Sequence, residues 1–406
     1  MQVEKSAGPL AGLRVIEMGS FIAGPFCAQI LADMGAEVIK IETPGSGDPM
    51  RQWGVNLKDG KSVWWPVIGR NKKSVTLDLH TSDGQDIARR LIMAADILVE
   101  NFRPGTLEQW NLGPEELRRE HPALIVARVS GFGQTGPYRE RAGFGSVAEA
   151  MGGLRTLAGF PDRMPPRVGI SIGDSLAGLF AALGVMASLH ARSASGTTGG
   201  RGQVVDVAIT ESVMAVLESV ISEYSATGIK RSRTGSILPG IAPSNLYPTK
   251  DGDWVLIAAN ADGVFRRLAA AMERPDLAAD PRYATHRSRG VSQLELDEII
   301  AEWSAALPAA TVVERLTAAG VPAGPVYDAA GVAQDPHFRD RGAVIDVETE
   351  DFGVLTMQGV APHFSDTPGS VRWPGASLGQ HNEEVYGELL GFSASDIARF
   401  RERGVM

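Results

Sequence analysis

The sequence has almost no cysteine: Cys27 is the only one among 406 residues. A single cysteine excludes an intrachain disulfide, which is typical of proteins that stay in the reducing cytoplasm. The seven histidines show no spacing typical of a metal site. The sequence therefore predicts a cytoplasmic protein with no bound metal and excludes a disulfide-stabilised secreted scaffold.

Positive charge and long apolar runs are also scarce. Lysine and arginine number 39 against 48 acidic residues, which gives a net charge of −9. No apolar run approaches the length of a membrane span, and the first residues lack the apolar segment of a signal peptide. We therefore expect neither nucleic acid nor a membrane as partner, and an anionic ligand would need a local basic patch.

The first half of the chain alternates strand and helix patterns. Apolar runs typical of buried strands cover residues 13–18, 36–42, 74–79, 97–100 and 124–130. Helical patterns cover residues 25–34, 83–94 and 114–120. This alternation predicts an α/β fold with a mostly parallel, Rossmann-like sheet and helices on both faces. Ligands of such sheets bind beyond the carboxyl ends of the strands.

The second half is less regular, and the length of the chain favours two domains. Residues 202–209 show a further strand pattern and residues 210–225 the pattern of one long helix. We predict a large domain, a smaller α+β domain and two long linkers. They cover, in that order, residues 1–205 with 330–406, residues 228–305, and residues 206–227 with 306–329.

Asp174 draws attention within the stretch from Arg167 to Ala191. Gly173 interrupts a short extended segment, and apolar residues follow at helical spacing, so we expect a buried helix to begin at Asp174. Two interpretations are open. Asp174 is the N-cap of that helix, or it is a nucleophile that the helix dipole keeps ionised beside unbonded backbone N–H groups.

One alternative function is that of a dinucleotide-binding dehydrogenase. Gly19 and Gly24 follow the first strand and partly match the phosphate-binding fingerprint G-x-G-x-x-G. Glu42 ends the second strand, where a ribose-binding acid would stand. Phe21, however, replaces the glycine that lets the backbone approach the pyrophosphate. Because the match fails at this glycine, the sequence gives an NAD-dependent dehydrogenase little support.

A series of short motifs runs through the whole chain. They are G-L-R-V-I-E (12–17), A-G-P (23–25), G-A-E-V-I-K-I-E (35–42), G-S-G-D-P with Arg51 (45–51), N-K-K-S-V-T-L-D-L (71–79), V-E-N-F-R-P-G (99–105), S-G-F-G-Q-T-G-P (130–137), G-D-S (173–175), G-x-G-Q-V-V-D-V (200–207) and G-V-P-A-G-P-V (320–326). In this order they resemble the class III CoA-transferases, the family of formyl-CoA transferase and carnitine CoA-transferase.

The resemblance implies a mechanism centred on Asp174. The family's nucleophilic aspartate falls on this residue, and Gly173 lets the backbone approach closely. The carboxylate attacks an acyl-CoA to give an anhydride, and the CoA thiolate then converts it into an aspartyl-CoA thioester. The acceptor acid repeats both steps in reverse. The family also forms an interlocked homodimer, which implies that Asp174 lies at a subunit boundary.

The resemblance further implies which residues bind CoA. Carried over one by one, they are Ala23, Arg51, Lys72, Leu77, Asn101, Phe102, Arg103 and Phe144. Lys73 adds to the basic side chains available for the CoA phosphates, with a solvated surface charge as the alternative for both lysines. CoA enters as part of the acyl-CoA substrate, and no tightly bound cofactor is expected.

A racemase of the same superfamily is the second alternative. The α-methylacyl-CoA racemases keep the aspartate and add a histidine base in an A-G-H-D motif about thirty residues before it. Here that stretch reads A-G-F-G, with Phe144 in place of the histidine and Gly145 in place of the acid. Phenylalanine cannot abstract a proton, so the sequence favours transfer over racemisation.

The acyl substrates are less plainly encoded. Formyl-CoA transferase has a mobile run of glycines where this chain has L-P-G-I-A-P over residues 238–243, with Gly240 and Ile241 at its centre. Two prolines predict a stiffer loop. Residues 161–175 resemble bacterial dicarboxylate CoA-transferases, which implies succinyl-CoA as donor and a C4–C6 dicarboxylate as acceptor. Arg141 or Arg167 could bind the distal carboxylate.

Overall fold

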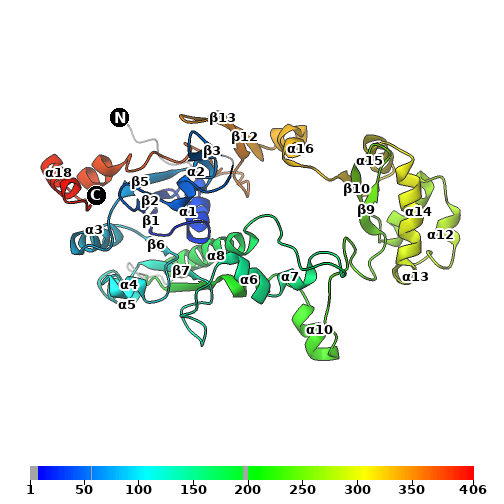
Figure 1. Ribbon diagram of the computed structural model, residues 1–406, viewed down its shortest axis with the longest axis horizontal. Helices are drawn as coiled ribbons and strands as arrows, with labels where there is room; N and C mark the ends of the chain where they lie inside the picture. Colours follow the sequence, from blue (N-terminus) through cyan, green and yellow to red (C-terminus); the bar gives the residue numbers. More distant parts are fainter. Residues whose placement is uncertain (1–7, 56, 195–199) are drawn as a thin grey trace. The chain divides into compact units, whose positions relative to one another are not determined.

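The computed structural model describes residues 8–55, 57–194 and 200–406, which fold into two compact units (Figure 1). The first unit extends to Leu154 and also includes Val168–Ile221 and Asp335–Met406. The second consists of Arg155–Arg167 and Ser222–Gln334. The chain therefore passes between the units four times.

A six-stranded sheet forms the centre of the first unit. Its strands, in spatial order, are β5 (Lys72–Thr76), β2 (Glu37–Glu42), β1 (Arg14–Glu17), β6 (Ile97–Glu100), β7 (Ile125–Ser130) and β8 (Val204–Ala208). Every neighbouring pair runs parallel. This arrangement confirms the predicted Rossmann-like sheet, and it gathers the carboxyl ends of all six strands along one edge.

Helices cover both faces of this sheet because successive strand residues point to opposite sides. Ile16 and Ile39 face a core shared with α3 (Ser82–Met93) and α5 (Pro114–Glu120). Val15 and Val38 face a second core. The helices of that second core are α1 (Ala23–Asp33) and α8 (Ile172–Ala194).

Shorter elements complete the first unit. They are η1 (Pro49–Arg51), β3 (Leu57–Lys58), β4 (Lys61–Ser62), α2 (Trp64–Ile68), α4 (Thr106–Gln109), α6 (Gly145–Met151), α9 (Ile209–Met214), α17 (Pro336–Asp340), the hairpin β12 (Val344–Thr349) and β13 (Gly353–Gln358), the π-helical segment η2 (Glu383–Leu389) and α18 (Ala394–Glu402). Two further helices, α7 (Leu154–Leu157) and α10 (Val220–Thr227), lie where the chain leaves this unit.

Helix α8 corrects two expectations. It begins at Ile172, so Gly173 lies inside it and Asp174 belongs to its first turn rather than being its N-cap. It is also 23 residues long, and a stretch of 18 residues within it has a mean hydropathy of 1.6, so it is long and apolar enough to cross a membrane by length and composition. Core helices pass the same test, and α8 buries Ala181 and Val185 in the core that it shares with α1.

The helix predicted over residues 210–225 is also wrong. The structure has two short helices there, α9 and α10, with residues 215–219 between them. Strand β5 begins two residues and ends three residues before the predicted 74–79, because Lys72 and Lys73 pair with β2 while Leu77 lies beyond the strand. Apolar pattern alone misplaced this strand, since its first two residues carry charge.

The C-terminal segment covers the outer strand of the sheet. The His381 amide donates to the Ser74 carbonyl over 3.0 Å. The Asn382 side chain accepts from the Thr76 amide over 2.9 Å, and the Tyr386 hydroxyl donates to the Thr76 carbonyl over 2.9 Å. Tyr386 is fully buried. Strand β5 therefore completes its packing with residues from the far end of the sequence.

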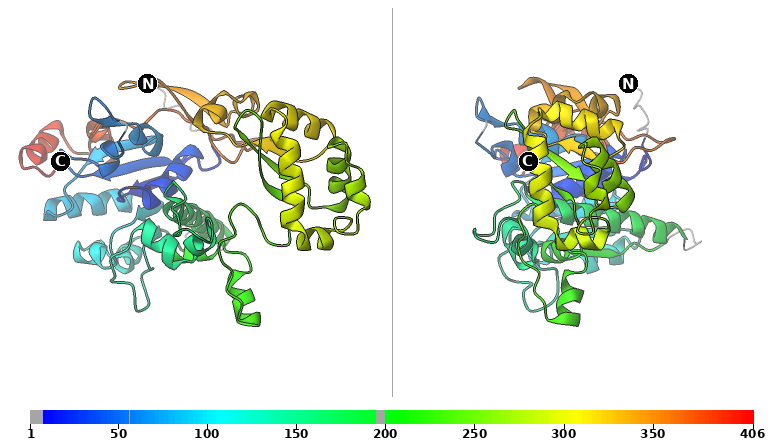
Figure 2. Two further views of the ribbon diagram at one scale, coloured as in Figure 1. Left: turned by 45° about the vertical axis from the view of Figure 1, so that its right-hand side comes forward. Right: turned by 90° about the vertical axis from the view of Figure 1, so that its right-hand side faces the viewer.

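The second unit is built on a three-stranded antiparallel sheet. Its strands are β11 (Ala323–Pro325), β10 (Trp254–Ala258) and β9 (Ser244–Pro248) in spatial order. Its helices are α11 (Asp262–Ala271), α12 (Asp276–Ala279), α13 (His286–Val291), α14 (Gln293–Ala305), α15 (Ala309–Ala318) and α16 (Ala329–Gln334). Helix α14 is the long yellow helix of Figure 2. The helices α11, α14 and α15 share one core with β10.

Candidate active site

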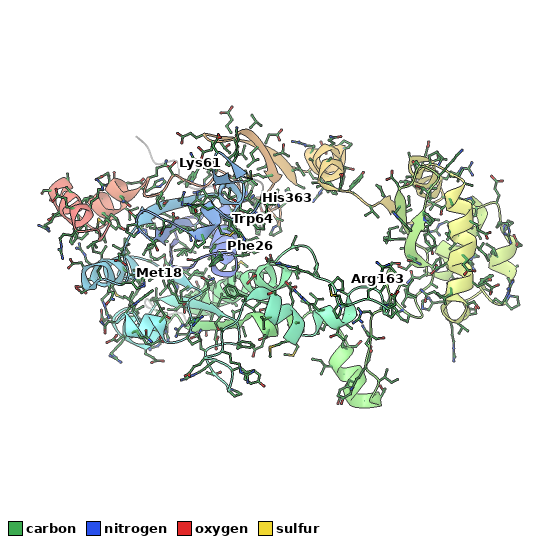
Figure 3. All side chains as sticks on the ribbon, viewed as in Figure 1. Met18, Phe26, Lys61, Trp64, Arg163 and His363 are labelled. Carbon is green, nitrogen blue, oxygen red and sulfur yellow. The ribbon has the colours of Figure 1, made fainter. Side chains whose placement is uncertain are left out.

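A small cavity of about 80 Å³ lies at the carboxyl ends of β1, β2 and β5. It is lined by Met18, Gly19, Ser20, Lys40, Ile41, Glu42, Thr43, Gly47, Asp48, Leu77, Asp78, Leu79, His80, Phe102 and Trp110. Figure 3 labels Met18, which follows β1 directly. Two of the predicted CoA contacts, Leu77 and Phe102, line this cavity.

Aromatic rings form one wall of the cavity. The rings of Phe102 and Trp110 are 5.0 Å apart edge to face, and the ring of His80 lies 5.5 Å from Trp110. His80 is exposed and Trp110 is half-buried. Flat rings beside a partly open cavity offer a stacking surface for a nucleotide base. Sequence analysis missed Trp110, since nothing in the motif around Phe102 points to it.

The floor beneath this cavity holds buried charges. The Lys40 ammonium contacts Glu17 over 2.6 Å and Asp48 over 2.9 Å, and the Lys72 ammonium contacts Glu17 over 2.7 Å. All four side chains are at most 2% exposed. Burial alone would lower the pKa of Lys40, but Asp48 and Glu17 raise it overall. Burial lowers the pKa of Lys72.

Lys72 is therefore not part of an open basic patch, contrary to the prediction. Its ammonium also donates to the Pro25 carbonyl over 2.7 Å. A lysine in this position ties the first turn of α1 to the sheet and does not reach a solvent-borne phosphate. The sequence could not reveal this, because a lysine at the start of a strand is usually solvated.

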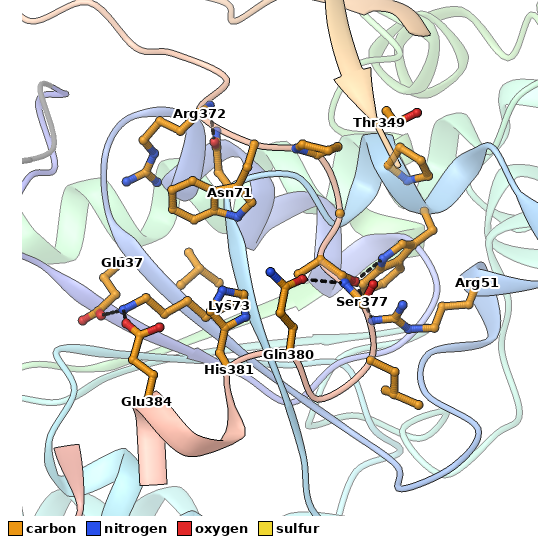
Figure 4. Close-up of a pocket in the computed structure, with 18 of the residues that line it drawn as sticks. Glu37, Arg51, Asn71, Lys73, Thr349, Arg372, Ser377, Gln380, His381 and Glu384 are labelled. Carbon is orange, nitrogen blue, oxygen red and sulfur yellow. Dashed lines mark hydrogen bonds and ion pairs between the residues drawn. The ribbon is translucent and has the colours of Figure 1, made fainter. Parts of the chain in front are cut away.

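Arg51 and Lys73 line a different, larger cavity of about 1680 Å³ along the C-terminal segment (Figure 4). Arg51 pairs with Glu42 through two nitrogens and lies 3.7 Å over the ring of Trp65. Lys73 bridges Glu37 and Glu384 at 2.6 Å each. Both cations are thus engaged within the protein.

Arg103 differs from the other three predicted basic residues. It is exposed directly after Phe102, and among the described residues no carboxylate pairs with it. Its guanidinium is therefore the one of the four that remains available to an anionic ligand near the small cavity.

The loop after β1 is fixed by Asn101. The Asn101 side chain accepts from the Ser20 amide and donates to the Ser20 carbonyl, both over 2.9 Å. A methyl group on Gly19 would lie 2.4 Å from the Asn101 Oδ1 atom, so glycine is required there. Asn101 therefore shapes this loop, and both the oxygen and the nitrogen of its side-chain amide form hydrogen bonds with it. Ala23, 3% exposed, packs where α1 meets α8 at Gly178.

The carboxylate of Asp174 lies against the backbone of Gly145, the first residue of α6. A methyl carbon at position 145 would be 2.1 Å from the Asp174 Oδ2 atom. One at Gly173 would lie 3.3 Å from the Gly145 carbonyl oxygen and 3.4 Å from Cγ of Glu149. Asp174 is half-buried, whereas Glu149 is fully buried. The two glycines let the first turns of α6 and α8 approach closely.

An exposed aromatic cluster begins beside this contact. It consists of Phe144, Phe21, Trp53 and Trp64. The rings of Phe144 and Phe21 are 6.4 Å apart, and those of Phe21 and Trp53 5.5 Å. Phe21 has a φ of 65°, unusual for a non-glycine residue. Phe144, which directly precedes Gly145, is thus 67% exposed. Its side chain has no titratable group.

Gly240 and Ile241 lie in the second unit, in the segment 238–243. The Gly240 amide donates to the Gln293 side chain over 3.3 Å, and the Arg289 guanidinium donates to the Ala242 carbonyl over 3.1 Å. A methyl group on Gly290 would lie 2.7 Å from the Gly240 carbonyl oxygen. Helices α13 and α14 thus hold this segment through contacts that its sequence did not predict.

The parallel six-stranded sheet with helices on both faces defines a doubly wound α/β protein, a fold whose ligands bind at the strand ends. The chain belongs to CoA-transferase family III, whose family model matches residues 10–382. It is therefore a CoA-transferase, for which acyl-CoA is a substrate, and the dehydrogenase alternative is dropped.

Similar proteins agree with this assignment. Succinyl-CoA–D-citramalate CoA-transferase of Chloroflexus aurantiacus is 54% identical over 406 residues, the full length of both chains. Succinate–glutarate CoA-transferase of Agrobacterium fabrum is 35% identical over 388 residues, 94% of this chain and 96% of that one. A CAIB/BAIF family protein from Brucella suis superposes with a TM-score of 0.82 at 34% identity, covering 94% and 99% of the two chains.

Proposed function

We propose that this protein transfers CoA from succinyl-CoA to a dicarboxylic acid, with Asp174 as the nucleophile. The observation that carries the substrate assignment is the 54% identity, over its entire length, to a transferase named for succinyl-CoA and D-citramalate. The position of Asp174 in the first turn of α8, half-buried beside two glycines, supports its role.

The proposed reaction needs no proton or electron from outside. One Asp174 oxygen forms a bond to the thioester carbonyl carbon, the C–S bond breaks, and CoA leaves as thiolate. The thiolate then attacks the Asp174 carbonyl of the anhydride and releases succinate, leaving an aspartyl-CoA thioester. The acceptor carboxylate attacks that thioester and releases the thiolate, which takes the acyl group and restores the Asp174 carboxylate.

We propose that the CoA nucleotide binds in the small cavity at the strand ends. Phe102 and Trp110 provide rings on which the adenine can stack, and Leu77 adds an apolar contact. Arg103 is exposed at the same edge and can pair with a phosphate. We assign the nucleotide to this cavity rather than to the larger one, where Arg51 and Lys73 are engaged by carboxylates.

The distal carboxylate of a dicarboxylic acid requires a cation, and Arg141 and Arg167 are the candidates. Arg141 is three residues before Phe144, and its guanidinium lies 3.6 Å over the ring of Tyr138. Arg167 ends the part of the second unit that precedes α8. Replacing each arginine by lysine, which keeps the charge but not the bidentate geometry, should raise KM for the acceptor acid only at the residue that binds it.

We further propose an interlocked homodimer. Large apolar side chains are exposed on α8, where Leu179 is 50% and Leu183 57% accessible in the single chain. Such residues on a long apolar helix fit a covered surface better than an open one. Light scattering from nanomolar to micromolar concentration should show a constant dimer, because linked chains cannot separate without unfolding. A folded, active monomer would contradict the proposal.

The direct test combines a substrate screen with trapping. Succinyl-CoA is incubated with single acids, namely citramalate, malate, glutarate, mesaconate and acetate, and new CoA esters are identified by mass spectrometry. We expect esters of the dicarboxylic acids and none of acetate. Hydroxylamine added during turnover should label Asp174 alone, as seen by peptide mass mapping. Labelling elsewhere, or transfer to acetate only, would refute the proposal.

A further inference from the structure

Gly145 leaves no room for a side chain, because the Asp174 carboxylate lies where its Cβ atom would be. A methyl carbon at position 145 would lie 2.1 Å from Oδ2, 2.7 Å from Cγ and 3.0 Å from Oδ1 of Asp174. Real side chains do not approach this closely, so the carboxylate would have to retreat by about 1 Å. The carboxylate therefore occupies the space that any other residue at position 145 would fill.

The surroundings of this contact leave little room for such a retreat. Gly173 precedes Asp174, and a methyl group there would lie 3.3 Å from both the Gly145 carbonyl oxygen and Cγ2 of Ile209. Gly145 is buried at the start of α6, and Glu149 lies one turn further along that helix, fully buried. Because α6 and α8 approach here at two glycines and the Ile209 side chain of α9 packs against them, the helices cannot separate without losing this packing.

We propose that Gly145 is a positioning residue, whose missing side chain provides the seat that fixes the Asp174 carboxylate for attack on the thioester. This inference rests on the proposed role of Asp174 as the nucleophile. The backbone of Gly145 lies against one side of the carboxylate, and Asp174 as a whole is only half-buried. A side chain at position 145 rotates the carboxylate out of this orientation.

Gly145 thereby has a function of its own in this chain. The A-G-F-G stretch lacks the acid that follows the histidine in racemases, and the structure shows what the glycine provides instead. A displacement of about 1 Å in a reacting group costs about 10²-fold in rate. CoA binding, which we place at the strand ends, is unaffected by such a displacement, so the loss falls on kcat rather than on KM.

The experiment compares Gly145→Ala with Gly263→Ala in the full-length protein. Gly263 also lies in the first turn of a helix, as the second residue of α11, but a methyl group there meets only arginine side-chain nitrogens at 3.9 and 4.0 Å. We expect Gly145→Ala to lower kcat with succinyl-CoA by about 10²-fold while KM changes less than about threefold. Gly263→Ala should leave both constants unchanged.

A double-mutant cycle keeps the test decisive if Gly145→Ala folds poorly. The loss of Tm caused by Gly145→Ala should be smaller in an Asp174→Ala background, since the atoms that clash are gone. Equal losses in both backgrounds, or a kcat within about threefold of wild type, would overturn the inference. Hydroxylamine labelling separates the two proposals: an unlabelled Asp174 in the wild type refutes both, whereas a labelled one with an unimpaired Gly145→Ala variant refutes this inference alone.

Discussion

Two carboxylates of the first unit are held in opposite ways. Glu17, 0% exposed, contacts the ammonium groups of Lys40 and Lys72 at 2.6 and 2.7 Å under the small cavity. Asp174 is half-buried and lies on the backbone of Gly145. A carboxylate enclosed by cations is locked in place and unreachable by substrate, and its value lies in stability. Asp174, which lies against a glycine and is only half-buried, is held in a way that suits the nucleophile that we propose.

The largest effect is expected at Asp174, and it is on the rate of turnover. Asp174→Asn should lower turnover by at least about 10³-fold, because an amide cannot form the anhydride. The free energy of unfolding should change by no more than about 1 kcal/mol, since the side chain is only half-buried. Steady-state assays and urea unfolding measure the two effects. The exposed Asp86, changed to Asn, is the control and should affect neither; a stable Asp174→Asn variant with near-normal turnover would remove Asp174 from the mechanism.

The same exchange of a carboxylate for an amide at Glu17 should lower the free energy of unfolding. Glu17→Gln removes the carboxylate that the buried Lys72 ammonium contacts and leaves the Lys40 ammonium with Asp48, which costs about 3–5 kcal/mol in the free energy of unfolding. Glu37→Gln is the matched control, because Glu37 also bridges two cations, Arg14 and Lys73, but with its side chain 33% exposed. That control should cost at most about 1 kcal/mol. Equal costs for the two variants would show that burial does not distinguish them.

A smaller effect is expected on CoA binding above the buried charges. Trp110→Ala removes one of the stacking rings of the small cavity, which should weaken CoA binding by about tenfold, within the 1–3 kcal/mol range of base–aromatic stacking. Isothermal titration with CoA measures this change. Trp254, exposed on β10 of the second unit, provides the control. An unchanged affinity in Trp110→Ala together with a weaker one in Trp254→Ala would place the nucleotide elsewhere.

The smallest effect is expected on the stability of the protein at acidic pH, through Glu42. Burial alone would raise the pKa of Glu42, but hydrogen bonds from Arg51 lower it below its usual 4.5. An acid whose pKa is lower in the folded state adds stability that is complete above pH 4.5 and is lost as the pH falls through the folded-state value, by at most about 1.4 kcal/mol per pH unit. Urea midpoints from pH 6 to pH 3 should therefore fall less steeply in Glu42→Gln than in the wild type. Parallel slopes would contradict the assignment.

The sequence predicted the strands of the sheet better than the partners of its charged side chains. Strand β6, over Ile97–Glu100, was predicted to the residue because all four of its side chains are buried. Strand β5 was misplaced because Lys72 looks solvated until Glu17, from another strand, supplies its partner. Such pairings depend on register across the sheet, which an apolar pattern does not encode.

The candidate site was predictable only where a motif marked it. Asp174 was singled out by its family motif and its place at the start of a helix. The seat at Gly145 could not be predicted, because it depends on the distance between α6 and α8 rather than on residue type. Trp110 was missed for the same reason: only the fold brings its ring to within 5.0 Å of Phe102.

The contact of Asn382 with Thr76 has a consequence for synthesis. The two residues are 306 positions apart, so on the ribosome they are made roughly 15–60 s apart at about 5–20 residues per second. During that interval β5 lacks the residues that cover it, including the fully buried Tyr386. A nascent chain therefore presents an uncovered strand edge long before it can fold completely, and a holding chaperone that masks this edge would raise the yield of folded protein.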